Sequence, residues 1–292
     1  MNFVGIGKTA LRVSMAMVIV AIVILVFRGL NLGIDFTGGS IMERQVDQSV
    51  TVEEIRTVLS NEVGELGVAD GVIQILDRSD QFLLRTRTLE TSEIMQIDAA
   101  LDAAFGGLQE RRTDMVGPVI GQELVRQALW ALLIAAVGIL AYVSVRFEFR
   151  FAGSAIAAVL HDVLFVLAVF AITGREINSP FVAAILTVVG YSINDTIVIF
   201  DKVRENLRFR KRETLEEVVN NSLNETLPRS INTSMTTFVV ILMLFVFGGA
   251  SISDFAFALL VGVLVGTYSS LFVASPVWLE WTLGAQKKPA QR

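Results

Sequence analysis

The chain has 292 residues, of which 53% are hydrophobic and 18% are charged, with a formal net charge of −5. Soluble domains carry about 25% charged residues, and the apolar excess here gathers in runs long enough to cross a hydrocarbon core about 30 Å thick. The sequence has no cysteine and one histidine, which excludes disulfides and thiolate chemistry and disfavours a metal site.

We expect a multi-pass α-helical membrane protein with six spans. Their approximate ranges are 10–28, 124–145, 151–173, 180–200, 230–247 and 255–278. The first run follows Lys8 and Arg12, as the core of a signal peptide would. It is longer than a usual signal core, however, and no small-residue cleavage site follows it, so we expect a retained anchor helix.

Lysine and arginine predict the orientation of the spans, because cytoplasmic loops carry an excess of them. If the N-terminus is cytoplasmic, every lysine falls inside and the short outer loops hold only Arg175. We therefore expect both termini to be cytoplasmic. Residues 1–28 would form the N-terminus and first span, 29–122 an extracytoplasmic domain, and 123–292 the other five spans with a cytoplasmic loop at 201–229.

The insert at 29–122 has the pattern of a small α+β domain. Thr51 and Glu54 have the spacing of a capping box. The element order is β-α-β-β-α-β, which is the ferredoxin-like arrangement. In chain order we expect a strand at Ile41–Val46, a helix at Thr51–Val63, a hairpin of Val72–Leu76 and Gln81–Thr86 around Asp77–Asp80, a helix at Thr91–Phe105 and a strand at Leu108–Val116.

The loop at 201–229 contains an amphipathic segment, Thr214–Leu227. One face carries apolar residues, and charged residues and asparagines occupy the rest. We expect this segment to be a separate helix lying along the inner membrane surface. The apolar residues are Leu215, Val218, Val219 and Leu223.

Asp195 is the strongest candidate for chemistry. It lies in the fourth span beside Asn194, and Tyr191 precedes it by one turn. A charged aspartate near the bilayer centre costs roughly 2.5–3.5 kcal/mol on insertion scales, so this polar stripe should face protein or water. A carboxyl that can be populated in both forms could load a proton on one side and release it on the other. The alternative is a structural hydrogen-bond node between helices.

His161 and Asp162 lie in the middle of the third span. Adjacent residues point about 100° apart on a helix, so we expect them to contact different neighbours. Proton handling and helix packing are both open for this pair. A zinc site is disfavoured.

Arg229 opens the fifth span at its cytoplasmic end, and Thr233 belongs to a polar face that continues from it. The other members of this face are Asn232, Thr236 and Thr237. An arginine near an acid stabilises its charged form and can change partners during a cycle. The alternative is an anchor whose charge reaches the interface.

The segment from Gly33 to Gly39 follows the first span. It lacks the spacing of a phosphate-binding loop. We expect its glycines to allow a tight turn. In the sixth span, Gly262, Gly266 and Ser270 form a small-residue face suited to close helix packing.

Several of these strings resemble the SecD and SecF proteins. The strings are Leu32–Gly39, containing Asp35, Gly38 and Gly39; Leu160–Val163; Gly190–Asp201 followed by Arg204–Asn206; and Asn224–Ser230 followed by Asn232–Ser234. They cover nearly the whole chain in order. One span, a small outer domain and five spans resemble the SecF family, membrane subunits of the SecDF protein-export complex in the resistance-nodulation-division superfamily.

The resemblance implies a partner and a mechanism. The chain would pair with SecD, associate with the SecYEG channel, and use the proton-motive force to help draw a preprotein outward after ATP-driven SecA has acted. Asp195 would transfer protons and Arg229 would lie in the same pathway. Tyr191 and Asn194 complete the expected relay, with His161, Asp162 and Thr233 as secondary candidates.

Two rival functions remain open, a subunit of a proton-coupled small-molecule exporter of the same superfamily and a non-transporting membrane scaffold. The insert is small for the substrate pockets of such exporters. No nucleophile–base or metal constellation is visible, so we expect neither an enzyme nor a cofactor. The expected surroundings are the lipid bilayer of a bacterial inner membrane and the protons that cross it, and nothing points to nucleic acid.

Overall fold

The computed structural model describes residues 1–76 and 78–287. The chain divides into two compact units, one of residues 1–31 with 130–292 and one of residues 32–129. The predicted hairpin turn includes Asp77, which lies outside the described residues, as do residues 288–292 of the predicted cytoplasmic tail.

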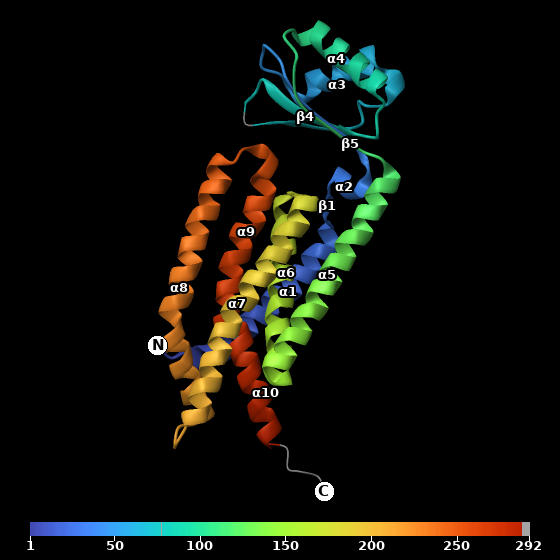
Figure 1. Cartoon of the computed structure of the whole chain (residues 1–292). Helices are drawn as coiled ribbons and strands as arrows, with labels where there is room; N and C mark the ends of the chain where they lie inside the picture. Colours follow the sequence, from blue (N-terminus) through green and yellow to red (C-terminus); the bar gives the residue numbers. More distant parts are fainter. Residues whose placement is uncertain (77, 288–292) are drawn as a thin grey trace. The chain divides into compact units, whose positions relative to one another are not determined.

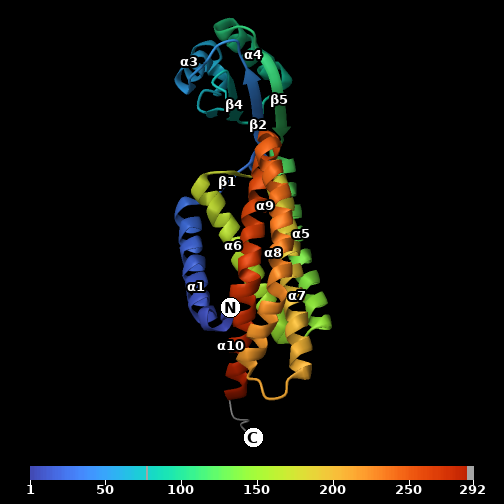
Figure 2. The ribbon, with the colours of Figure 1, turned by 90° about the vertical axis from the view of Figure 1, so that its left-hand side faces the viewer.

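Among the described residues, six helices are long and apolar enough to cross a membrane, which confirms the predicted class. They are α1 (Phe3–Arg28), α5 (Pro118–Arg146), α6 (Phe149–Thr173), α7 (Ser179–Phe209), α8 (Leu215–Phe247) and the run formed by α9 (Ala250–Ser269), the π-helical turn η2 (Ser270–Ala274) and α10 (Ser275–Lys287). The short strands β1 (Asn31–Leu32) and β6 (Glu176–Ile177) follow α1 and α6. Figure 1 shows α6, α7 and α9 grouped together, and Figure 2 shows α1 beside α6 and α8 beside α9.

The helices of this bundle differ in how much of their surface other helices cover. In α6 and α7, 44% of the most apolar stretch is buried, and in the run of α9, η2 and α10 the share is 61%. It is 6% in α5 and 11% in α8. The helices α6, α7 and α9 therefore form the centre of the unit. Large parts of α5 and α8 are left for lipid or another protein.

The smaller unit is an α+β fold of the predicted element order. Its elements are α2 (Ile34–Thr37), β2 (Gly39–Gln45), α3 (Val52–Glu62), the 3-10 turn η1 (Gly64–Leu66), β3 (Val72–Ile75), β4 (Gln81–Thr86), α4 (Thr91–Phe105) and β5 (Gln109–Val116). The sheet order is β3-β4-β2-β5 with antiparallel neighbours, and α3 and α4 lie on one side of it (Figure 1). The core between helices and sheet contains Met42, Ile55, Leu59, Phe82, Leu84, Ile97 and Leu101.

Capping and one buried ion pair fix the helices of the α+β unit. The Thr51 side chain accepts from the backbone N–H of Glu54, and Glu54 accepts from the backbone N–H of Thr51, as the capping-box spacing predicts. This backbone hydrogen bond holds the pKa of Glu54 below its usual value. On β2, the fully buried Arg44 pairs through two nitrogens with Asp98 of α4, at 2.7 and 3.0 Å.

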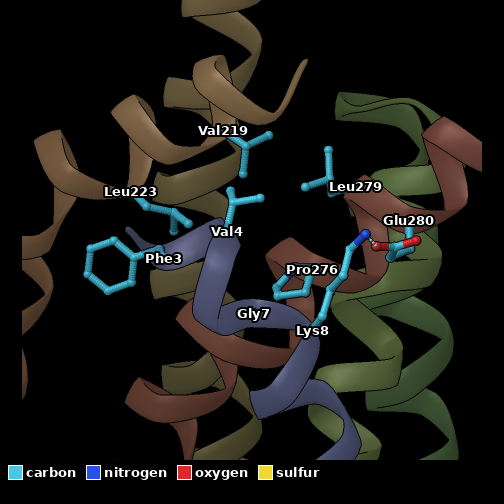
Figure 3. Close-up of a pocket in the computed structure, with 9 residues that line it drawn as sticks. All are labelled: Phe3, Val4, Gly7, Lys8, Val219, Leu223, Pro276, Leu279 and Glu280. Atoms are coloured by element: carbon cyan, nitrogen blue, oxygen red, sulfur yellow. Dashed lines mark ion pairs between the residues drawn. The ribbon is translucent and has the colours of Figure 1, made fainter. Parts of the chain in front are cut away.

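The prediction of a separate surface helix at Thr214–Leu227 is wrong. Thr214 does cap a helix, but α8 continues for 33 residues through Pro228 and includes the fifth span. Its apolar face packs in the core of the bundle with Phe3 and Leu279, so it is not laid on lipid. Figure 3 shows this end of the bundle, where Lys8 of α1 also pairs with Glu280 of α10 at 3.3 Å.

Candidate functional site

Close packing of α7 against α9 places the candidate site. A side chain at Gly262 would overlap Val188 of α7, and one at Gly266 would meet Ser192 Cβ at 3.1 Å. The predicted small-residue face is therefore the surface that lets α9 approach α7. One further turn along this face lie two fully buried serines, Ser269 and Ser270.

Asp162 is hydrogen-bonded through both of its carboxyl oxygens. Its Oδ2 accepts hydrogen bonds from Ser192 Oγ of α7 at 2.6 Å and from Ser269 Oγ of α9 at 2.7 Å. Its Oδ1 lies 3.0 Å from His161 Nδ1. One buried carboxyl thus joins α6, α7 and α9.

The expectation that His161 and Asp162 serve different neighbours holds only in part. Asp162 contacts α7 and α9, and the His161 ring lies near Phe165 and Tyr268. The two side chains also bond to each other, which the 100° separation along the helix did not predict. His161 Nε2 is buried and has no partner among the described residues.

Asp195 lies on the same face of α7 as Ser192 and is only partly satisfied. Its Oδ1 accepts from Ser230 Oγ of α8 at 2.5 Å. Its Oδ2 is buried and has no hydrogen-bond partner within the part of the chain that the structure describes. A buried acceptor without a partner costs about 1–3 kcal/mol. Binding a proton or meeting a new hydrogen-bond donor would remove this cost.

Hydroxyl groups connect the rest of this face of α7 to its neighbours. Thr196 Oγ1 is hydrogen-bonded to Ser270 Oγ at 2.9 Å. Tyr191 donates to Ser234 Oγ of α8 at 3.1 Å, and Ser234 Oγ is bonded to Thr267 Oγ1 of α9 at 2.6 Å. The polar part of the α7–α8–α9 contact therefore consists of hydroxyls together with the Asp195 carboxyl.

The structure places the other predicted residues outside this cluster. Asn194, Arg229 and Thr233 are exposed. Within residues 1–76 and 78–287, Arg229 forms no ion pair with Asp195, although it is next to Ser230, which does contact Asp195. The side chains of α8 that contact α7 are those of Ser230 and Ser234. These two serines do not belong to the predicted polar face, which contains Asn232, Thr233, Thr236 and Thr237.

In the segment that follows the first span, the backbone conformation requires glycine at two positions. Gly38 and Gly39 have φ of +70° and +131°, and a Cβ on Gly39 would lie 2.6 Å from the Thr86 carbonyl oxygen. This close approach lets β2 begin beside β4. Asp35 lies in the short helix α2, half-buried.

Sequence reasoning missed the serines that complete the site, namely Ser192, Ser230, Ser234, Ser269 and Ser270. A signal was available for two of them. Ser192 is three residues before Asp195, and Ser270 belongs to the predicted packing face. No group of three or more metal-binding side chains lies together among the described residues.

Fold and site together define a multi-pass α-helical membrane protein with a carboxyl-and-hydroxyl cluster inside its helix bundle. The family of protein export membrane proteins SecD/SecF matches this chain through its C-terminal region at residues 96–284, and the SecD/SecF GG motif matches at residues 23–50. The chain belongs to the SecD/SecF family.

Its relatives include both separate and fused proteins. It is 40% identical over 289 residues to protein translocase subunit SecF of Desulfurispirillum indicum, covering 96% of this chain and 91% of that protein. It is 42% identical over 286 residues to the SecF subunit of Thermodesulfovibrio yellowstonii, covering 95% of this chain and 93% of that one. It is also 42% identical over 273 residues to protein translocase subunit SecDF of Bacillus subtilis, covering 92% of this chain but 36% of that protein.

A solved structure has the same fold. The crystal structure of SecDF from Thermus thermophilus, a translocon-associated membrane protein, matches with a TM-score of 0.88 and 35% identity. The match covers 97% of this chain and 39% of that one, so this chain spans about two fifths of the SecDF protein.

Proposed function

We propose that this chain works as a SecF-type subunit of the bacterial Sec protein translocase. With SecD, it would use the proton-motive force to promote preprotein export through SecYEG after ATP-driven SecA action. Family membership and the names of relatives that match along nearly their whole length support this role.

The observation that carries the proton-coupled part is the half-satisfied carboxyl of Asp195. One oxygen is bonded to Ser230 of α8 and the other is buried without a partner. Ionised, the group can only accept hydrogen bonds; protonated, it can also donate one. Binding or losing a proton therefore changes what α7 offers to α8, and this change would drive the movement of the outer domain.

The other relay residues have supporting parts in this proposal. Tyr191 extends the contact of Asp195 with α8 by one turn, through Ser234. Asn194, Arg229 and Thr233 would act from exposed positions, with Arg229 adjacent to the serine that holds Asp195. His161 and Asp162 would serve as a second polar centre, and Asp35, Gly38 and Gly39 would shape the exit of the first span.

The available energy suits a conformational step. One charge that crosses 100 mV yields about 2.3 kcal/mol. That amount can bias a domain between two arrangements, although it cannot unfold a stable preprotein in one step. Repeated cycles would be needed to draw a chain outward.

The proposed topology has both termini in the cytoplasm and residues 29–122 outside. The lysine distribution supports this orientation, since Lys8, Lys202 and Lys211 fall on one side of the spans. The sparsely covered α5 and α8 offer surface to a partner. SecD is the proposed partner, because SecDF relatives join a matching segment to additional chain.

The test is Asp195→Asn in the complete translocase. Asparagine keeps the shape and removes the titration. We expect preprotein translocation into inverted membrane vesicles to keep its ATP-driven part and to lose its stimulation by a proton gradient. Asp201→Asn is the matched control, because Asp201 is an exposed carboxyl on the same helix. Gradient stimulation of the Asp195 variant at the wild-type level would refute the proton-coupled role.

A further inference from the structure

Arg175 is the one lysine or arginine in the short outer loops of the predicted topology. It lies between α6 and β6, and its Nη1 donates to Asp254 Oδ1 of α9 and, at 3.3 Å, to Ser253 Oγ. The backbone N–H of the next residue, Glu176, donates to Asp254 Oδ2 at 3.3 Å. Both carboxyl oxygens of Asp254 therefore hold the segment that follows α6.

The guanidinium group of Arg175 also lies against two aromatic rings. Its central carbon is 4.3 Å from the ring centroid of Phe257 on α9 and 5.5 Å from that of Phe245 on α8. A cation within about 6 Å of a ring centroid is attracted to the face of the ring. Arg175 thus joins the end of α6 to both α8 and α9, and α8 is the helix whose Ser230 holds Asp195.

The same segment holds one of the two connections to the α+β unit. The chain passes between the two units at residues 31–32 and 129–130. The second connection lies in α5, whose most apolar stretch is only 6% buried, so the bundle has few contacts with which to move it. At the first connection the Asn31 side-chain amide donates to the carbonyl oxygen of Gly174, next to Arg175, at 2.9 Å, where α1 and α6 end side by side (Figure 2).

We infer that Arg175 is a positioning residue that transmits a change at Asp195 to the α+β unit, because it ties the Asn31 connection to the outer ends of α8 and α9. The inference rests on the proposed function in taking Asp195 as a group whose protonation displaces α8. A guanidinium group is planar, so it can stack on rings while its edge binds a carboxylate. A displacement of Phe245 or Asp254 therefore acts on Arg175 and, through Gly174, on Asn31.

A second route from α8 to α1 exists at the cytoplasmic end of the bundle. Asn220 Oδ1 of α8 accepts a hydrogen bond from the backbone N–H of Phe3 at 2.7 Å. Lys8 of α1 pairs with Glu280 of α10 at 3.3 Å near the same end. The 26 residues of α1 span about 39 Å, so substitutions can separate this route from the one through Arg175.

The test measures single-molecule fluorescence transfer in the complex with a cysteine-free partner, reconstituted in lipid. The dyes are attached at Ser60→Cys on α3 and Lys211→Cys between α7 and α8, two exposed positions in different units. Asp195→Asn fixes the uncharged form, so we expect it to shift the transfer efficiency. Arg175→Ala or Asp254→Ala should reduce that shift by at least half, because each removes the ion pair between β6 and α9.

Two further variants distinguish transmission from a general loss of structure. Exchange of the two charges, Arg175→Asp with Asp254→Arg, re-forms the ion pair and should recover the Asp195-dependent shift, as expected for coupled residues. Glu280→Ala is the matched control, because it breaks an ion pair of the same bundle at the opposite end of α1. It should leave the shift at its full size.

The inference is wrong if the shift survives Arg175→Ala, if Glu280→Ala reduces it as much, or if Asp195→Asn produces no shift. It is also wrong if Asn220→Ala alone abolishes the shift, since α1 would then be driven from its cytoplasmic end. Should Arg175→Ala fail to fold, Asp254→Ala decides.

The same variants separate this inference from the proposed function. If Asp195→Asn leaves gradient-driven export intact while the shift depends on Arg175, the proposed function fails and the inference stands. If Asp195→Asn abolishes the gradient stimulation while the shift survives Arg175→Ala, the proposed function stands and the inference fails.

Discussion

Two intramembrane carboxyls of this chain differ in how well their surroundings satisfy them. Asp162 has donors from Ser192 and Ser269 and a bond with His161, so both of its oxygens are engaged. Asp195 has Ser230 on one oxygen and nothing on the other within the described chain. Complete satisfaction suits a fixed node between helices, and partial satisfaction suits a group that changes state.

Loss of the Asp162 carboxyl should therefore weaken the helix bundle itself. Asp162→Ala leaves the Ser192 hydroxyl and a His161 imidazole nitrogen without their acceptor and removes the shorter of the two hydrogen bonds of Ser269. Each buried group left without a partner costs about 1–3 kcal/mol. We expect destabilisation of about 3 kcal/mol or more, measured by chemical unfolding of the purified protein in detergent.

Asn194→Ala serves as the comparison, since Asn194 is an exposed residue of α7. Exposed substitutions of this kind usually change stability by about 0.5 kcal/mol or less. Equal stability of the two variants would show that the hydrogen bonds of Asp162 do not hold the bundle together.

The helices whose ends are determined by nearby residues were predicted closely from the sequence. The helix α4 has the predicted bounds, and α3 begins after the predicted capping residue Thr51. The segment from Leu215 to Leu227 was misread because an apolar helix face has the same pattern whether it meets lipid or protein. Only the fold shows that this face packs on α1 and α10.

At the start of β2, glycine is required at position 39 for two reasons, its backbone conformation and the lack of room for a side chain. Gly39 has φ of +131° and no room for a Cβ beside the Thr86 carbonyl. Gly39→Ala should therefore loosen β2 from β4, seen as faster hydrogen exchange along both strands. Gly67→Ala is the control in the same unit, because Gly67 also has a positive φ, +63°, but has open space around it.

The two glycine variants compare an open left-handed turn with a position that is crowded as well. A left-handed conformation costs an alanine roughly 1–2 kcal/mol, which applies at Gly67; the φ of +131° at Gly39 lies outside that region and is more restricted for alanine. Only Gly39→Ala adds the contact with Thr86. If both variants exchange at the same rate, neither the backbone conformation of Gly39 nor its close approach to Thr86 requires glycine at position 39.

For the whole molecule, hydropathy located the spans because lipid requires every backbone polar group to be bonded within its own helix. This requirement on the backbone does not determine which helices pack against each other. The serines that complete the site come from α7, α8, α9 and η2, which are far apart in sequence. The sequence of an apolar span does not show whether a serine in it is hydrogen-bonded to its own helix or to a neighbouring one. Asp195 could therefore be predicted and its partners could not.

The orientation of the chain in the membrane can be tested directly, because the chain contains no cysteine. Ser60 is exposed on α3, and Lys211 is exposed between α7 and α8. With the plasma membrane intact, a membrane-impermeant maleimide should label Ser60→Cys and should label Lys211→Cys only after permeabilisation.

The unsubstituted chain gives the background, and a membrane-permeant maleimide checks that both thiols can react. The opposite pattern would place the α+β unit in the cytoplasm and contradict the assignment drawn from the lysines. It would also reverse the direction in which a proton passing Asp195 could drive that unit. The labelling result therefore constrains the proposed motor at the level of the whole molecule, independently of any single residue of the site.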